Sequence, residues 1–482
     1  MENQERIAKL VQNDWSTAPV PKEFRRSNYG VVATLVGQII ALSGIYIGAS
    51  MVGGMSLSEA FLATICGSAI LAVLGGFLSW VGTKTGVGLS MLLRESFGTI
   101  GSYIISVMLL FVAVGFFGYQ ATFFGDTIHA MFPGAGWITN STVAGVWGGL
   151  LMMTTALVGY KGIEWLSNWA SPLILVMCIA SCILAIVRIG SLSAFNDITL
   201  SYSGMTLSTA VVAVVGGYAF GACLQPDFSR FGKSLSATTG GSVLGFLVAN
   251  VFMTMAGYIT CAACGTGDVP TALLQILGYW SLLILVFAQW TSNDGNLYFG
   301  TLALTTIIPK TNKHVLTAIF GVVGIALSTL GITAYFLTFL GWLGTAIPPV
   351  AGIVIVDYFV IKKGEYHYGE GTRHHFCNIV ALIAWVAGAA VGFTVTWGIA
   401  AINSIVVTGV VYLVLSLAFK GSDKIYIGGD FVEDELGNIY PEKSAPAKDE
   451  TGSSLLRPGK GRYEHGHCHQ KHHPRHRRRD HA

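Results

Sequence analysis

Long runs of apolar residues constrain the fold of this chain more than any single motif does. About twelve stretches between Tyr29 and Phe419 are each long enough to cross the hydrocarbon core of a bilayer as a helix, which takes roughly 20 residues. Charged residues make up only 11% of the chain, whereas soluble domains carry about 25%. Transmembrane β-strands would be shorter and would alternate in polarity. The sequence therefore predicts an all-α, polytopic membrane protein.

The same pattern divides the chain into four parts. Residues 1–28 form a polar N-terminal segment without the apolar core of a signal peptide. Residues 29–360 contain ten spans, and 361–419 contain two more. Residues 420–482 form a polar tail rich in His and Arg, which could bind metal or anionic headgroups but which we expect to be a disordered extension. The expected spans are 29–51, 57–81, 99–127, 142–160, 167–188, 204–224, 237–260, 274–306, 314–333, 335–360, 377–395 and 398–419.

Lysine and arginine predict the orientation, because cytoplasmic loops hold most of these residues. With the N-terminus inside, the loops on the outside contain only Arg188. A wrong number of spans would break this alternation. We therefore expect a multi-pass protein of the cytoplasmic membrane with both termini in the cytoplasm. The inside segments then contain, besides the tail, Arg6, Lys9, Lys22, Arg25, Arg26, Lys84, Arg94, Lys161, Arg230, Lys233, Lys310, Lys313, Lys362, Lys363 and Arg373.

Two of the spans contain helix-breaking residues. The first reads VGQIIALSGIYIGASMVGG, and the sixth continues as VVGGYAFGACLQPDFSRFG with a proline and charged residues. A helix break at membrane depth is tolerated where it lines a cavity or is buried in protein, and transporters use such breaks to bind ions and substrates. The two interrupted spans are the first and the sixth, which suits two inverted repeats of five spans that each begin with a broken helix. The alternative is that glycines such as Gly44 and Gly48 only allow helices to pack closely.

The eighth span, LVFAQWTSNDGNLYFG, carries a polar cluster inside an apolar segment. Such clusters are costly in a membrane and usually face the interior of the helix bundle. Hydroxyl groups together with carbonyls of a broken helix make a hard-oxygen site, which suits Na⁺. Asp294 is also a candidate for binding a proton, and a polar network that only joins helices is the alternative. The polar residues of the cluster are Thr291, Ser292, Asn293, Asp294 and Asn296.

Aromatic and amide side chains complete the candidate site. Phe116 and Gln120 lie four residues apart in the third span and therefore share a helix face. In the sixth span, Gly217 precedes Tyr218. Two aromatic rings on different helices can enclose a flat ring while amides bind its polar edge. Each aromatic residue taken alone could equally serve packing.

Several motifs resemble the nucleobase:cation symporter-1 family, over nearly all of residues 25–420. They are PDFSRFG after the sixth span, WTSND in the eighth, and FLGWLGTAIPPVAGIVIVDYF in the tenth. The resemblance implies a fold similar to that of the leucine transporter, with ten spans in two inverted five-span repeats plus two C-terminal helices. It also implies a sodium site between the first and eighth spans. Its ligands would be the carbonyls of Gly37, Ile40 and Ala288 and the hydroxyls of Thr291 and Ser292.

The resemblance further implies the substrate-binding residues. Phe116 and Tyr218 would stack on the substrate, and Gly217 would offer backbone groups. Gln120 matches an amide of hydantoin-type members, and Asn293 matches one that cytosine permeases use. Ala113 and Phe220 stand where cytosine permeases carry polar residues, so cytosine itself is not a firm expectation. By analogy, the segment 336–339 of the tenth span would form a thin gate.

From these features we expect a secondary active transporter that imports a flat nitrogen heterocycle by cation symport with alternating access. Na⁺ is the expected coupling ion, and H⁺ is the alternative. For the substrate, the alternative is another small solute such as an amino acid. A channel would need a charged ring or filter loop, and an enzyme would need a nucleophile with a base or a metal cluster; neither is evident. We expect no cofactor, no nucleic-acid partner and no obligate protein partner.

Overall fold

The computed structural model describes residues 4, 7, 10–11, 14–158, 160–196, 205–305, 307–308, 311–419, 426–434, 436 and 438–442. Within this part, ten helical segments are long and apolar enough to cross a membrane, and two shorter apolar helices add to them. These ten plus two segments coincide one for one with the twelve predicted spans. The prediction of an all-α membrane protein is thus confirmed, with short strands added near residues 373–378 and 426–441.

Most spans are single helices, and several are divided into two pieces. The first five spans are α2 (Asn28–Gly37) with α3 (Leu42–Met51), α4 (Leu57–Thr85), α5 (Leu89–Met131), α6 (Ser141–Val158) and α7 (Tyr160–Ile189). The next five are α8 (Leu207–Cys223) with α9 (Gln225–Ser229), α10 (Leu235–Leu244) with α11 (Val251–Cys264), α12 (Val269–Leu277) with α13 (Ser281–Thr305), α14 (Lys313–Ser328), and α15 (Phe336–Ala346) with α16 (Pro348–Val356). The last two are α17 (Ile379–Thr394) and α18 (Ala400–Ala418).

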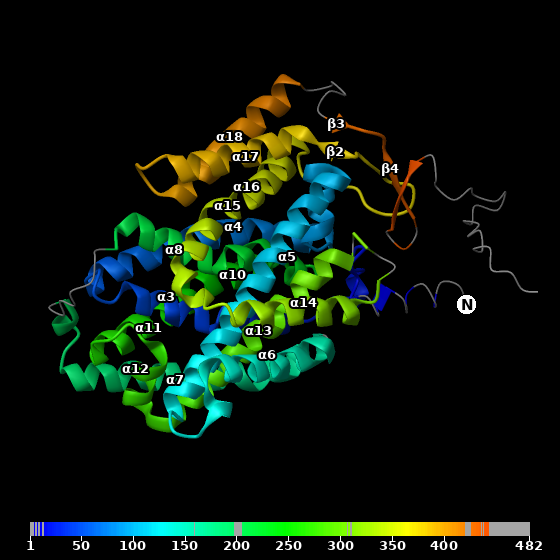
Figure 1. Cartoon of the computed structure of the whole chain (residues 1–482). Helices are drawn as coiled ribbons and strands as arrows, with labels where there is room; N and C mark the ends of the chain where they lie inside the picture. Colours follow the sequence, from blue (N-terminus) through cyan, green and yellow to red (C-terminus); the bar gives the residue numbers. More distant parts are fainter. Residues whose placement is uncertain are drawn as a thin grey trace, which may run out of the picture. The chain divides into compact units, whose positions relative to one another are not determined.

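The first ten spans contain two groups of four that pack together (Figure 1). The first helix group holds spans one, two, six and seven: α4 contacts α8 and α10, and α3 contacts α11. The second helix group holds spans three, four, eight and nine: α5 and α6 each contact α13 and α14. In two five-span repeats, span two corresponds to span seven and span one to span six. The contact between spans two and six therefore corresponds to the contact between spans seven and one. This pairing is the one that two inverted five-span repeats predict.

Glycines let helices of the first group approach at backbone distance. A Cβ atom on Gly48 of α3 would lie 1.8 Å from the Thr254 carbonyl oxygen of α11. The tenth span packs on the sixth in the same way, because a Cβ atom on Gly216 of α8 would lie 1.9 Å from the Leu340 carbonyl oxygen of α15. Close contact of this kind stabilises helix pairs in membranes, where helices gain little from the hydrophobic effect. Gly48 therefore has the packing role that the sequence left open.

Helices α17 and α18 pack on each other and on α15 and α16, at the top of Figure 1. Short antiparallel strands join the chain before α17 to the chain after α18, with β4 between β1 and β5, and β2 beside β3. Part of the polar segment 420–482 thus forms paired strands. The His- and Arg-rich end of this segment lies outside the described residues. The strands are β1 (Arg373–His374), β2 (Cys377–Asn378), β3 (Tyr426–Ile427), β4 (Phe431–Glu433) and β5 (Ile439–Pro441).

A buried cluster of charged residues connects these strands to the first ten spans. His374 of β1 places Nε2 2.9 Å from Glu433 Oε2 and Nδ1 3.4 Å from Glu95 Oε1. Lys362, which follows the tenth span, places Nζ 2.7 Å from Glu95 Oε2. Burial disfavours the charged imidazole, but the hydrogen bonds with the two carboxylates outweigh it and raise the pKa of His374. Strands β1 and β4 are therefore tied to the start of α5.

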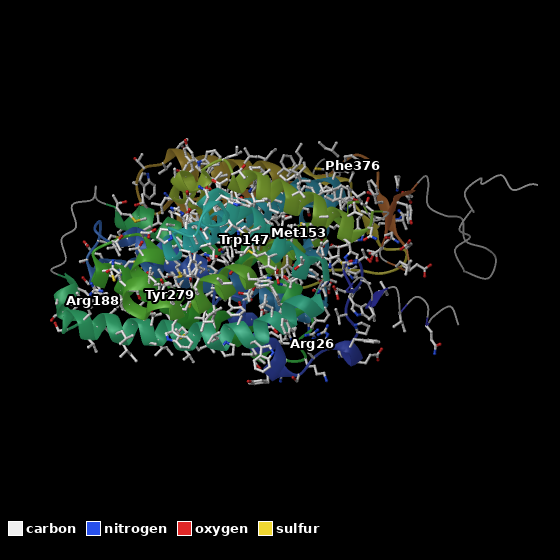
Figure 2. All side chains as sticks on the ribbon, turned by 60° about the horizontal axis from the view of Figure 1, so that its bottom comes forward. Arg26, Trp147, Met153, Arg188, Tyr279 and Phe376 are labelled. Carbon is white, nitrogen blue, oxygen red and sulfur yellow. The ribbon has the colours of Figure 1, made fainter. Side chains whose placement is uncertain are left out.

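Two arginines assigned to opposite sides of the membrane, Arg26 and Arg188, lie toward opposite ends of the structure. Figure 2 shows Arg26 and Phe376 toward one end and Arg188 and Tyr279 toward the other. This separation agrees with the predicted alternation of the loops. Which end faces the cytoplasm stays a prediction.

The packing of α3 on α11 leads to a first testable prediction. We expect Gly48→Ala to destabilise the protein by about 1–3 kcal/mol, because the added methyl group overlaps a main-chain oxygen that cannot move away alone. Gly240→Ala in α10 is the control, since a Cβ atom there meets open space. Thermal unfolding in detergent should show a lower midpoint for Gly48→Ala only. Equal midpoints for the two variants would contradict the close packing.

Candidate substrate and cation site

The first span is interrupted between α2 and α3, as its glycines predict. The N–H of Ile40 donates to the Gly37 carbonyl at 3.1 Å. The N–H of Ala41 then reaches back only to the Ile39 carbonyl, at 2.8 Å. Neither bond uses the Ile40 carbonyl. Of the two carbonyls in this span that the resemblance assigns to a cation, the break therefore frees that of Ile40, whereas that of Gly37 still accepts a main-chain N–H.

The sixth span is interrupted later than its glycines. Helix α8 runs unbroken through Gly216 and Gly217, the chain turns at Leu224, and α9 begins with Pro226 in its first turn. Glycine permits a break without requiring one, whereas proline cannot continue the helical hydrogen bonds. Gly217 serves close packing instead, because a Cβ atom there would lie 2.2 Å from Ile47 Cδ1 of α3. The sixth span is thus held directly against the broken first span.

The hydroxyls predicted to bind the cation lie on one turn of the unbroken helix α13. Thr291 Oγ1 donates to the Phe287 carbonyl at 2.9 Å, and Ser292 Oγ donates to the Ala288 carbonyl at 2.7 Å. Helix α13 also contacts α3. The structure therefore brings Ala288, Thr291 and Ser292 together, on a helix that is a neighbour of the broken span. Both hydroxyl hydrogens point at carbonyls, so each hydroxyl oxygen keeps lone pairs that can accept a cation.

Phe116 and Gln120 lie on one buried face of α5, as predicted. Their side chains are 5% and 3% exposed. The Phe116 ring lies edge-on to Phe339 of α15, with centroids 5.2 Å apart. Gln120 Oε1 is buried and has no hydrogen-bond partner among the described residues. Tyr218 is also buried, and α8 contacts α5.

Asn293 and Asp294 face the second helix group. Asn293 Nδ2 donates to the Phe117 carbonyl at 3.2 Å and lies 3.3 Å from Met152 Sδ, whereas its Oδ1 is buried and has no partner among the described residues. Asp294 Oδ1 accepts from the Thr155 hydroxyl at 2.6 Å. The polar cluster thus divides between two faces of α13. The amide nitrogen of Asn293 already serves the contact with α5 and α6, so only its oxygen is available to a ligand.

An aromatic cluster covers one side of this site. Its rings come from α3, α5 and α15. Tyr46 stacks on Phe123 with centroids 3.7 Å apart, and Phe336 lies edge-on to Phe123 at 5.2 Å. The cluster contains the predicted gate residues and others that the sequence analysis missed, although their spacing along the third span could have indicated them. The members are Tyr46, Tyr119, Phe123, Phe336 and Phe339.

Two cavities lie on the other side, toward the start of α5. One, of about 190 Å³, is lined by residues that include Trp15, Arg230 and Tyr298. The other, of about 20 Å³, extends along Leu89–Leu109 of α5 and shares Asp227 with the first. The smaller cavity is lined by α5 residues that precede Phe116, and the α5 members of the aromatic cluster follow Phe116, so the candidate site lies between the two along this helix. Neither cavity includes a predicted substrate-binding residue.

The N-terminal segment closes over the larger cavity, which the sequence analysis did not foresee. Arg230, itself buried, donates to the main-chain carbonyls of Trp15 and Asp14, both at 2.9 Å. The carboxylate of Asp14 accepts from the Tyr298 hydroxyl and lies 3.7 Å from Lys313 Nζ. The segment therefore connects the end of the sixth span to the eighth and ninth.

Comparisons with known proteins agree with this geometry. Residues 19–419 match the family described as "Permease for cytosine/purines, uracil, thiamine, allantoin". Cytosine permease of Escherichia coli K12 is 29% identical over 405 residues, which cover 84% of this chain and 94% of that protein. Hydantoin permease of Microbacterium maritypicum is 24% identical over 384 residues, covering 71% and 76%.

A solved structure shows the same fold. It is the nucleobase-cation-symport-1 family transporter Mhp1 in a closed conformation with bromovinylhydantoin bound, with a TM-score of 0.73, 20% identity, and coverage of 85% of this chain and 96% of that one. The family match spans most of the sequence and all twelve apolar segments. This chain is a multi-pass membrane protein that belongs to the family of permeases for cytosine and purines, uracil, thiamine and allantoin.

Proposed function

We propose that this protein imports a flat nitrogen heterocycle across the cytoplasmic membrane by symport with Na⁺. The substrate class is that of nucleobases, hydantoins and allantoin. Binding takes place between the third, sixth and eighth spans, and the two helix groups move relative to each other to expose the site alternately. Both termini are placed in the cytoplasm on the distribution of Lys and Arg.

The observation that carries this proposal is the buried face of α5. Phe116 presents an aromatic ring there, and one turn later Gln120 presents an amide oxygen without a partner among the described residues. A buried, unpaired amide oxygen costs about 1–3 kcal/mol. A heterocycle that stacks on the ring can donate an N–H to this oxygen and remove that cost. Amino acids lack the flat surface that the ring would cover.

The residues of the predicted cation site fit Na⁺. Their donors are neutral hydroxyl and carbonyl oxygens, which suit a hard monovalent ion. No group of three or more His, Cys, Asp or Glu side chains that could hold a different metal occurs in the described part of the chain. The Thr291 and Ser292 hydroxyls would offer their oxygen lone pairs to the ion. The Ala288 carbonyl oxygen would bind the ion while it also accepts the hydrogen bonds of these hydroxyls. Bound Na⁺ supplies positive charge that draws the carbonyls of the broken span toward α13.

A proton is the second candidate for the coupling ion, and Asp294 is the observation that favours it. Its carboxylate is fully buried, and Oδ2 has no partner among the described residues. A buried charge without a counterion is strongly disfavoured. The neutral acid can instead donate to the Thr155 hydroxyl. An H⁺-coupled carrier would need no Na⁺ for binding or uptake.

The arrangement around the site also supports alternating access. The aromatic cluster covers the site at one end, and the cavities approach it from the other. The N-terminal segment closes over the larger cavity at that other end. A carrier requires two closures that open in turn, whereas a channel requires a continuous pore.

A ligand panel tests the proposed function directly. Purified protein is heated with cytosine, uracil, adenine, hypoxanthine, allantoin, hydantoin or leucine, each in NaCl or choline chloride. We expect one heterocycle to stabilise the protein, by about 2.7 kcal/mol at a hundred times its dissociation constant, and more strongly in NaCl. Stabilisation by leucine alone would contradict the substrate class. Equal stabilisation in both salts would contradict sodium coupling and favour the proton.

The cation site is tested by the double substitution of Thr291 and Ser292 with Ala. We expect heterocycle binding in choline chloride to stay within about threefold of the wild type, and the gain on adding NaCl to disappear, because two of the oxygen ligands are removed. Thr301→Ala is the matched control: its hydroxyl makes the same bond to the preceding turn of α13, to Leu297. Retained sodium dependence in the double variant would exclude this site.

Gln120→Met tests the amide on α5. Met has a similar length without the polar oxygen, so we expect the ligand-free protein to be as stable as the wild type or about 1 kcal/mol more stable. Heterocycle affinity should fall by about tenfold or more, since the N–H of the ligand loses its acceptor. Thermal unfolding without ligand and isothermal titration with ligand measure the two effects. Unchanged affinity would show that Gln120 does not contact the substrate.

A further inference from the structure

The hydroxyl of Tyr218 is bonded to the break of the first span. It donates to the Ile39 carbonyl at 3.0 Å, with the Ala41 carbonyl as a second acceptor at 3.4 Å. These two carbonyls flank Ile40, whose own carbonyl belongs to the proposed cation site. A side chain of α8 thus adds a donor to two carbonyls of the break, which also accept the N–H groups of Ala41 and Gly44. Nothing in the sequence pattern of either span predicts this bond.

The surroundings of the hydroxyl are shaped to receive it. A Cβ atom on Gly44, at the start of α3, would lie only 3.1 Å from the Tyr218 hydroxyl oxygen and 3.0 Å from Met253 Cβ. Any larger residue would compete with the phenol for this space. Ile39 is buried as well. The bond is therefore made in a dry environment, where a hydrogen bond is stronger than in water and its loss is costly.

The ring and the hydroxyl of Tyr218 consequently have different functions. Its ring is the surface proposed to stack on the heterocycle, and its hydroxyl holds the segment that carries the Ile40 carbonyl. The ring and the oxygen form one rigid group, so a shift of the ring on substrate binding moves the hydroxyl relative to the break. A change in the break on cation binding moves the ring in turn. Such coupling is reciprocal by thermodynamic necessity.

We propose that the Tyr218 hydroxyl is a positioning group that couples the cation site to the substrate site. It acts by holding Ile39–Ala41 in the conformation that presents the Ile40 carbonyl to the cation. This inference rests on the proposed symport function and adds to it the residue that links the two sites. A phenylalanine in this position would provide the same stacking surface without the link.

Tyr218→Phe in the full-length purified protein is the test. The coupling factor is the ratio of heterocycle dissociation constants in choline chloride and NaCl, measured with the heterocycle that stabilises the wild type most. Because the coupling factor is a ratio, a change in stacking that weakens binding equally in both salts leaves it unaltered. The coupling factor should fall about tenfold, equivalent to about 1.4 kcal/mol. The effect of the heterocycle on Na⁺ affinity should fall by the same factor.

Hydrogen exchange gives a readout that needs no heterocycle. With Na⁺ alone, we expect amides of residues 39–44 to exchange about tenfold faster in Tyr218→Phe than in the wild type. Tyr258→Phe is the matched control, because the Tyr258 hydroxyl is also buried and donates to a carbonyl near the first span, that of Met55 at 2.8 Å. It should leave both the coupling factor and the 39–44 amides unchanged.

The outcomes separate this inference from the proposed function. A sodium-coupled wild type whose coupling survives in Tyr218→Phe overturns the inference alone. Loss of heterocycle binding in both salts also overturns it, because the hydroxyl would then act on the substrate itself. A wild type without sodium coupling overturns the proposed symport, and with it the coupling role. If the amides of residues 39–44 exchange equally fast in Tyr218→Phe and in the wild type, the hydroxyl does not hold the break, whichever ion is coupled.

Discussion

The requirement that every buried main-chain polar group be paired governs this structure more than any other interaction. A helix satisfies it within one segment, which is why twelve helical spans account for most of the described chain. The first span departs from this pattern at Ile39–Ala41, where the Ile40 carbonyl accepts no main-chain N–H among the described residues. The Tyr218 hydroxyl adds a side-chain donor to the Ile39 and Ala41 carbonyls, and to supply it α8 has to lie against the break and α3. The position of the sixth span is therefore a consequence of the break in the first.

Two kinds of contact then divide the molecule. Within the first helix group, and between the sixth and tenth spans, glycines bring backbones together, as Gly48 and Gly216 do, and such contacts leave no room for sliding. On the site's closed side, between α3, α5 and α15, the contacts are faces and edges of aromatic rings such as Tyr46 and Phe123. Rings can rotate and slide with small changes in energy. The stiff contacts thus lie inside a packed unit and the adaptable ones at the boundary that a carrier must open.

The number and position of the spans could be predicted because each depends on a local run of apolar residues. The hydroxyl pair Thr291 and Ser292 could be placed for the same reason, since adjacent residues of one apolar run lie on the same turn of one helix. The break in the sixth span was harder to place: glycine marked several possible points, and only the structure shows the turn at Leu224. The orientation of Asn293 and the acceptor of Tyr218 depend on helix rotation and distant partners. No local pattern contains that information.

The end of the molecule near the cavities shows how far such distant contacts extend. Arg230 follows the sixth span, and Tyr298 and Lys313 belong to the eighth and ninth, so they come from different helix groups. The N-terminal segment bonds to all of them through Asp14 and Trp15. The two groups cannot separate at this end unless these bonds break or the segment moves with one group. Because α5 leads from here to Phe116, the same contacts that close the cavity also set how freely the candidate site can open toward it.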